Sequence, residues 1–190
     1  MVEPFTPKFM RIDAKLGIGI EYHAHVLPGA YYEYLQTLWG TGRVGEFLRG
    51  REAEMKVLNK VPNAGRMAFL RQWIGTATNS INGTCYIALG TGTSSPADTD
   101  VQLSSEGVRS LCTDSAEDVV NIKASFFVVF SPGVASGTWQ EIGAFITGDD
   151  KVVSGTANSG VLFSRALLPI VVPALDVLAI EARLSLISLT

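Results

Sequence analysis

Cysteine, histidine and charge are all scarce in this sequence, and each shortage excludes a class of protein. Two cysteines among 190 residues cannot supply the disulfide framework of a small secreted domain. Cys85 and Cys112 do not form a CxxC metal-binding pair, so we expect two buried free thiols, with one disulfide as the alternative. Charged residues make up 17% of the chain and sum to -3, which argues against binding nucleic acid or a membrane surface through overall charge.

Long apolar runs are also missing. The closest candidate for a membrane-spanning stretch, residues 161–180, is interrupted by Pro169, Pro173 and Asp176. The first seven residues lack a basic start followed by an apolar run, so we expect no secretory leader and synthesis in a reducing cytosol. Hydrophobic residues nevertheless make up 47% of the chain, which predicts a folded protein with one good core.

The two histidines are the candidates for a metal site. His23 and His25 are two residues apart, so on a strand their imidazoles would share a face and could chelate a metal ion. A third ligand would have to come from a carboxylate such as Glu21 or Glu33. We expect ordinary surface or interface histidines, with no metal and no other cofactor.

Helical spacing is confined to the first part of the chain. Residues 1–30 are rich in proline and glycine, which predicts an extended arm with at most one short strand around 16–22. Residues 31–39 place aromatic and leucine side chains at helical intervals, and residues 47–60 indicate an irregular helix or a solvated connector. A third helix is expected over residues 62–74.

Beyond these helices, apolar stretches alternate with turns rich in glycine, proline and aspartate. The alternation is clearest over residues 119–130 and 175–186. Shorter strands are expected over residues 84–89, 139–146 and 161–168. Five or more strands without intervening helices predict an antiparallel β-sandwich, so the fold class is mainly β with some α. We expect residues 1–61 to form an N-terminal arm and helical docking region, and residues 62–190 to form a helix plus the sandwich domain.

A Gly-Thr-Gly-Thr sequence at residues 90–93 suggests a phosphate-binding loop at first sight. It lacks the Lys-Ser/Thr of a Walker loop and the βαβ unit of a dinucleotide site, so we expect its glycines to permit a left-handed turn. Trp139 and Glu141 could serve a sugar-binding or glycosidase site, but we expect a packed tryptophan and a solvated or arginine-paired glutamate. No G-x-S-x-G elbow occurs. No catalytic residue is assigned, and the protein is expected not to be an enzyme.

Residues 86–100 and 137–145 carry a family likeness. They read Tyr-Ile-Ala-Leu-Gly-Thr-Gly-Thr-Ser-Ser-Pro-Ala-Asp-Thr-Asp, followed by Leu103, and Gly-Thr-Trp-Gln-Glu-Ile-Gly-Ala-Phe. These stretches resemble a β-sandwich module of tailed-bacteriophage virion proteins, which are often tail, baseplate or tail-fibre components. Arg-Ala-Leu-Leu-Pro at 165–169 fits the same module, and the likeness covers roughly residues 62–190.

The resemblance implies a structural subunit of a tailed-bacteriophage virion, associated with the tail or baseplate. Its implied partners are other virion structural proteins and further copies of itself in a symmetric assembly, with no nucleic acid and no membrane. A head decoration protein is the alternative within this class, and a carbohydrate-binding β-sandwich is the alternative of another class. The region in front of the module is expected to dock through Tyr31, Tyr34, Leu35, Leu38 and Trp39.

Overall fold

The computed structural model describes residues 15–51, 53, 55–73, 75–77, 84–118, 123–148 and 151–189. The strands in this part of the chain are β1 (Lys15–Pro28), β2 (Met55–Leu58), β3 (Cys85–Gly90), β4 (Glu106–Leu111), β5 (Asp114–Asp118), β6 (Lys123–Phe130), β7 (Gly137–Ile146), β8 (Val161–Val172) and β9 (Asp176–Leu189). The helices are α1 (Tyr31–Leu38), α2 (Val44–Arg49) and α3 (Asn63–Trp73). Residues 1–14 of the expected arm and residues 119–122 of an expected strand lie outside the described residues.

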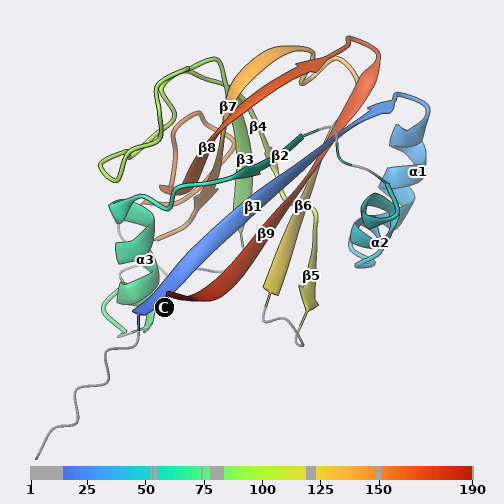
Figure 1. Cartoon of the computed structure of the whole chain (residues 1–190). Helices are drawn as coiled ribbons and strands as arrows, with labels where there is room; N and C mark the ends of the chain where they lie inside the picture. Colours follow the sequence, from blue (N-terminus) through green and yellow to red (C-terminus); the bar gives the residue numbers. More distant parts are fainter. Residues whose placement is uncertain are drawn as a thin grey trace, which may run out of the picture.

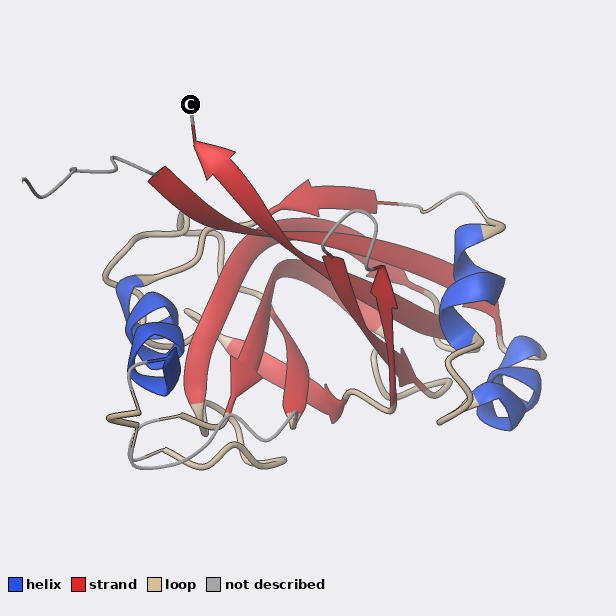
Figure 2. Ribbon diagram, turned by 90° about the horizontal axis from the view of Figure 1, so that it is seen from below, coloured by secondary structure: helices blue, strands red, loops and turns tan. Residues whose placement is uncertain are grey.

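Two antiparallel sheets form the body of the molecule. One has five strands in the order β2-β1-β9-β6-β5, and the other has four strands in the order β4-β3-β7-β8. Figures 1 and 2 show the sheets packed face to face, with an apolar core between them that includes Tyr22, Ile87, Phe130, Ile142 and Ile180. The predicted mainly β fold, an antiparallel sandwich with short helices, is confirmed.

Strand β1 is the largest difference from the sequence-based expectation. It pairs with β9 along its whole length, from Lys15 opposite Leu189 to Pro28 opposite Asp176, and it pairs with β2 on its other side. Its glycines and its terminal proline obscured a two-residue alternation that places Ile20 in the core. Residues 15–58 thus supply two sandwich strands, where their composition had predicted an arm and a docking region.

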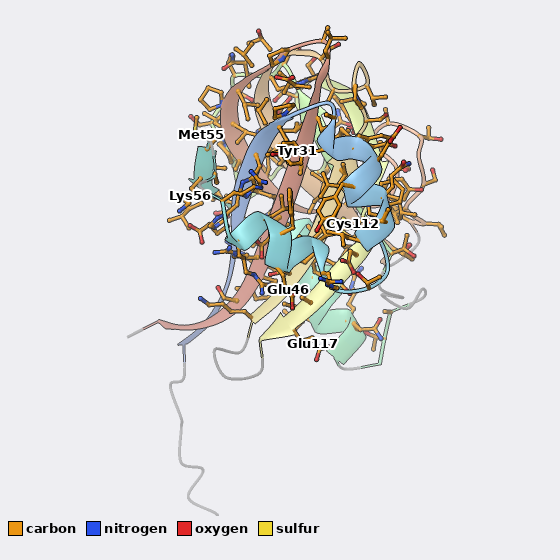
Figure 3. All side chains as sticks on the ribbon, turned by 90° about the vertical axis from the view of Figure 1, so that its right-hand side faces the viewer. Tyr31, Glu46, Met55, Lys56, Cys112 and Glu117 are labelled. Carbon is orange, nitrogen blue, oxygen red and sulfur yellow. The ribbon has the colours of Figure 1, made fainter. Side chains whose placement is uncertain are left out.

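Helices α1 and α2 pack on the outer face of the five-stranded sheet (Figures 1 and 3). Their apolar side chains meet Phe127 and Val129 of β6 and Val177 and Ala179 of β9. Asp114 of β5 accepts hydrogen bonds from the backbone N–H groups at 42 and 44, at 3.1 and 3.3 Å, and thereby fixes the start of α2.

Residues 47–60 were expected to form an irregular helix or a solvated connector, but α2 ends at Arg49 and residues 55–58 form strand β2. Met55 and Val57 pack against the inter-sheet core, and β2 pairs with β1. Lys60 then exchanges two backbone hydrogen bonds of 2.9 Å with Arg165 of β8. This short segment therefore joins the edge of one sheet to the edge of the other and fixes the position of Arg165.

The helix expected over residues 62–74 is present as α3, and it packs closely on β8. A Cβ atom at Gly65 would lie 2.7 Å from the carbonyl oxygen and 2.9 Å from the Cα of Phe163. Both neighbours are backbone atoms, so α3 can approach β8 this closely because residue 65 has no side chain.

Gly65→Ala should therefore push α3 away from β8 and lower the free energy of unfolding by about 1–3 kcal/mol. Gly50→Ala is the matched control, because a Cβ atom there would have its nearest neighbour at 3.7 Å. Its effect should stay within about 0.5 kcal/mol. Urea denaturation of both variants measures the difference, and equal stabilities would contradict the proposed close packing.

Candidate functional site

Two loops, residues 91–105 and the described residues of 147–160 (147–148 and 151–160), cover the outer face of the four-stranded sheet. Leu103 from the first loop and Val153 from the second are buried against Ala88, Phe145 and Leu162 of the sheet. The apolar contacts alone do not explain the loop conformations, because each loop is also tied down by a buried arginine. The residues around these two arginines form the best-defined polar sites of this sheet.

Arg165 on β8 is the centre of the first site. Its Nε donates to Glu141 Oε2 at 2.9 Å, and its Nη1 donates to Asp100 Oδ2 at 2.8 Å. Its Nη2 donates to the carbonyl oxygen of Ser94 at 2.9 Å and to Ser104 Oγ at 2.7 Å. The guanidinium is buried, and its donors are directed at a strand carboxylate and at both arms of the 91–105 loop.

Glu141 on β7 holds the same loop through its backbone. Its Oε1 accepts from the N–H groups of Gly92 at 3.0 Å and Ser105 at 2.8 Å, and its Oε2 accepts from the N–H of Ser104 at 3.1 Å. A Cβ atom at Gly92 would lie 2.4 Å from Glu141 Oε1, and one at Gly90 would lie 2.6 Å from it. The predicted left-handed turn is wrong, because neither glycine has a positive φ. These glycines allow the loop to approach a carboxylate.

A second buried arginine secures the other loop. Arg109 of β4 pairs with Glu106, with Nη2 donating to Oε2 at 2.7 Å. Nη1 of Arg109 donates to the carbonyl oxygens of Ser154 at 3.0 Å and Ser159 at 3.2 Å, and Glu106 Oε2 accepts from the N–H of Asn158 at 2.9 Å. Sequence inspection missed this site, because neither β4 nor the loop at 154–159 has a distinctive pattern.

The chemistry of these sites is that of fixed ion pairs. Burial raises the pKa of Asp100, but hydrogen bonds from the backbone N–H of Ala97 and from Arg165 outweigh it and lower the pKa overall. The Glu141 carboxylate is buried and already accepts from three backbone N–H groups and from the Arg165 guanidinium. This arrangement positions loops and leaves Glu141 no open side from which to act as a general acid or base on a substrate.

Trp139 and Glu141, the two residues considered for a sugar site, both make structural contacts. The indole Nε1 of Trp139 donates to the carbonyl oxygen of Ala135 at 2.7 Å, and its ring lies against Gly107. Glu141 is paired with Arg165, so of the two expected environments for this carboxylate the arginine-paired one is confirmed.

Helix α1 and its C-cap residue Trp39 carry the five residues predicted to bind partners. Leu35 and Leu38 are buried against the chain's own sheet, so they hold the helix in place and are not available to a partner while α1 stays docked. Tyr34 is 48% exposed, and Tyr31, labelled in Figure 3, is half-buried. Trp39 is also half-buried and packs edge-on against Tyr32, with ring centroids 6.2 Å apart.

Phe47 and Arg51 form a surface group with Tyr31 and Tyr34. The ring of Phe47 lies 5.8 Å from that of Tyr31 and 5.4 Å from that of Tyr34, measured between centroids. The guanidinium carbon of Arg51 lies 4.7 Å above the Tyr31 ring and 4.4 Å above the Phe47 ring. We call these four residues the aromatic–arginine cluster. The sequence did not reveal it, because the turn between the helices brings α2 back alongside α1.

His23 and His25 lie on the outer face of β1 and are buried, with exposures of 5% and 3%, so the expectation of surface histidines is wrong. His23 Nε2 lies 2.9 Å from Glu21 Oε2, and this close contact lowers the pKa of Glu21. Among the described residues, no group of three or more His, Cys, Asp or Glu side chains is placed to hold a metal ion.

A buried carboxylate also attaches α2 to the five-stranded sheet. Glu181 of β9 accepts from Ser125 Oγ at 2.8 Å and from Arg183 Nη2 at 2.9 Å, and Arg49 of α2 lies 3.5 Å from it. Burial raises the pKa of Glu181, but the hydrogen bonds from Arg183 and Ser125 and the charge of Arg49 outweigh it and lower the pKa overall.

The fold and these sites define an antiparallel β-sandwich whose surface loops and helices are fixed by buried ion pairs. No protein-family model, no curated protein and no solved structure matches the chain. Within the described residues, none of the helices has the length and apolar character needed to cross a bilayer.

Arg165→Met should lower the free energy of unfolding by about 3–5 kcal/mol, because it leaves buried carboxylates without their cation. The control is Arg43→Met, which removes an exposed ion pair with Glu46 whose atoms are 3.7 Å apart, and which should cost about 0–1 kcal/mol. Chemical denaturation measures both. Similar small losses in the two variants would show that the buried network does not hold the loop.

Acid should destabilise the protein through Asp100 and Glu181. Their folded-state pKa values lie below the ordinary values of 3.8 and 4.5, so their stabilising effect is complete above those values and is lost as the pH falls through the lowered ones. Denaturation curves from neutral pH down to about pH 3 should show this decline. Glu181→Gln should flatten it, whereas the exposed Glu46→Gln should leave it unchanged. An equal pH slope in both variants would refute the assignment to Glu181.

Proposed function

We propose that this protein is a non-enzymatic structural subunit of a tailed-bacteriophage virion, associated with the tail or baseplate. In this proposal it docks onto neighbouring virion proteins, and onto other copies of itself in a symmetric assembly, through the aromatic–arginine cluster on α1 and α2. The likeness of residues 86–100 and 137–145 to virion β-sandwich modules supports the class. The aromatic–arginine cluster supports the mode of docking.

The observation that carries the docking proposal is the composition and rigidity of that cluster. Tyrosine, phenylalanine and arginine are enriched in protein interfaces, and a few such side chains commonly supply most of the binding energy. Here Arg51 is already stacked on Tyr31 and Phe47, so little side-chain freedom remains to be lost on binding. Leu35 and Leu38 hold the supporting helix on the sheet beneath it.

The loop sites support an assembly role in a different way. Residues 86–100, 137–145 and 165–169, which carry the family likeness, converge on one ion-pair network made by Asp100, Glu141 and Arg165. A network of this kind gives a loop one defined shape, and a subunit that presents the same surface in every copy needs such a shape.

Particle incorporation tests the proposal. Tyr34→Ala and Arg51→Ala, combined in the full chain, should reduce the amount of the protein in purified particles roughly tenfold or more, because both side chains would lie in the interface. Point variants are needed, because a deletion of residues 1–30 would remove β1 from between β2 and β9.

Arg43→Ala is the matched control, since Arg43 is an exposed arginine at the start of α2 whose partner is Glu46. It should enter particles normally, and thermal unfolding should show that all variants remain folded. Normal incorporation of the folded double variant would overturn the docking proposal. A few copies per particle would support the tail or baseplate, whereas hundreds of copies would indicate a head decoration protein instead.

A further inference from the structure

Cys85 and Cys112 lie opposite each other on neighbouring antiparallel strands. The ladder between β3 and β4 pairs Tyr86 with Leu111, so the next pair along it is Cys85 with Cys112. The backbone N–H of Cys112 donates to the carbonyl oxygen of Cys85 at 2.8 Å, which continues the ladder through this pair. Two cysteines far apart in the sequence are therefore brought together by strand register.

The two thiols also point the same way. Cys85 is only 4% exposed and belongs to the inter-sheet core, and Cys112 is half-buried and packs against the same core. The neighbouring Cys85 side chain raises the pKa of the Cys112 thiol. Residues opposite each other on antiparallel strands have Cα atoms about 4.5–5.5 Å apart, which lies within the range of about 4.4–6.8 Å found across disulfides. A bond between these sulfurs needs no large backbone movement.

We propose that Cys85 and Cys112 are an oxidisable pair that closes into a cross-strand disulfide when the folded protein meets a small-molecule disulfide such as oxidised glutathione. This inference does not depend on the proposed function. Both residues are free thiols in the structure.

The reaction is a double thiol–disulfide exchange. The less buried thiol, Cys112, loses its proton, and its sulfur attacks one sulfur of oxidised glutathione and expels a glutathione thiolate. Cys85 then loses its proton, and its sulfur attacks that of Cys112 and expels the second glutathione. Two protein thiols are oxidised, one glutathione disulfide is reduced, and the two protons go to the two glutathione thiolates.

The surroundings of the pair make this reaction slow at neutral pH. The interaction with the Cys85 side chain and burial raise the pKa of the Cys112 thiol, so little of the reactive thiolate is present. Tyr22 of β1 is a titratable group in the same inter-sheet core, and burial raises its pKa as well. A cavity of about 310 Å³ between the sheets, lined in part by Cys85, leaves room around that sulfur.

Closure of the disulfide would tie β4 to β3. Strand β4 is an edge strand, and it carries Glu106 and Arg109, which hold the loop at 154–159. A covalent link at the end of this ladder would therefore strengthen the attachment of that loop to the sandwich.

Oxidation of the full, folded chain tests the proposal. The reduced protein is incubated with oxidised glutathione at several pH values, and intact mass and peptide mapping follow the products. A mass lower by two hydrogens and a peptide linking Cys85 to Cys112 are expected, with a rate that rises about tenfold per pH unit below the thiol pKa. The melting temperature of the oxidised protein should rise by about 5 °C or more and return on addition of dithiothreitol.

Cys85→Ala is the matched control. It keeps Cys112 but removes the resolving sulfur, so it should accumulate a mixed disulfide with glutathione and show no rise in melting temperature. The proposal is overturned if the folded parent protein retains two free thiols after prolonged oxidation, or keeps an unresolved glutathione adduct. It is equally overturned if the parent protein links to a second chain instead of closing internally.

Discussion

The buried pair of Arg165 and Glu141 is the interaction on which the outer face of the four-stranded sheet depends. A guanidinium removed from water has to be surrounded by acceptors, and here these come from a neighbouring strand and from both arms of one loop. The register between β7 and β8 also makes room for the covering loop. Gly143 stands opposite Arg165 on β7 and β8, and its missing side chain leaves room for Leu103 of the covering loop.

The five-stranded sheet uses the same principle on its own outer face. Glu181 is fully buried, and its partners include Arg49 from α2, so a helix takes the place that the loop has on the other sheet. Both carboxylates are occupied by structural partners. They fix the surfaces that surround the core, and an invariant surface is what a repeated subunit contact requires.

Strands β3, β6, β7, β8 and β9 and helix α3 could be predicted from the sequence, because their apolar alternation or helical spacing is local, whereas β4 and β5 have no such pattern. Strand β1 could not be predicted, because its glycines lower the local strand propensity. In the folded chain, pairing with β2 and β9 outweighs this low propensity. Tertiary packing separates the proposed partner-binding residues of α1 into buried and exposed ones. Leu35 and Leu38 face the sheet, while Tyr34 remains exposed beside Phe47 and Arg51.

The sequence alone determined that the chain forms an antiparallel sandwich with short helices, because residue periodicity and turn composition are properties of neighbouring residues. Only the tertiary structure decided which distant side chains meet. Glu141 meets Arg165, Arg51 stacks on Tyr31, and Cys85 stands opposite Cys112. Such meetings depend on the register between strands and on the direction in which loops and helices fold back, and no local pattern encodes either of them.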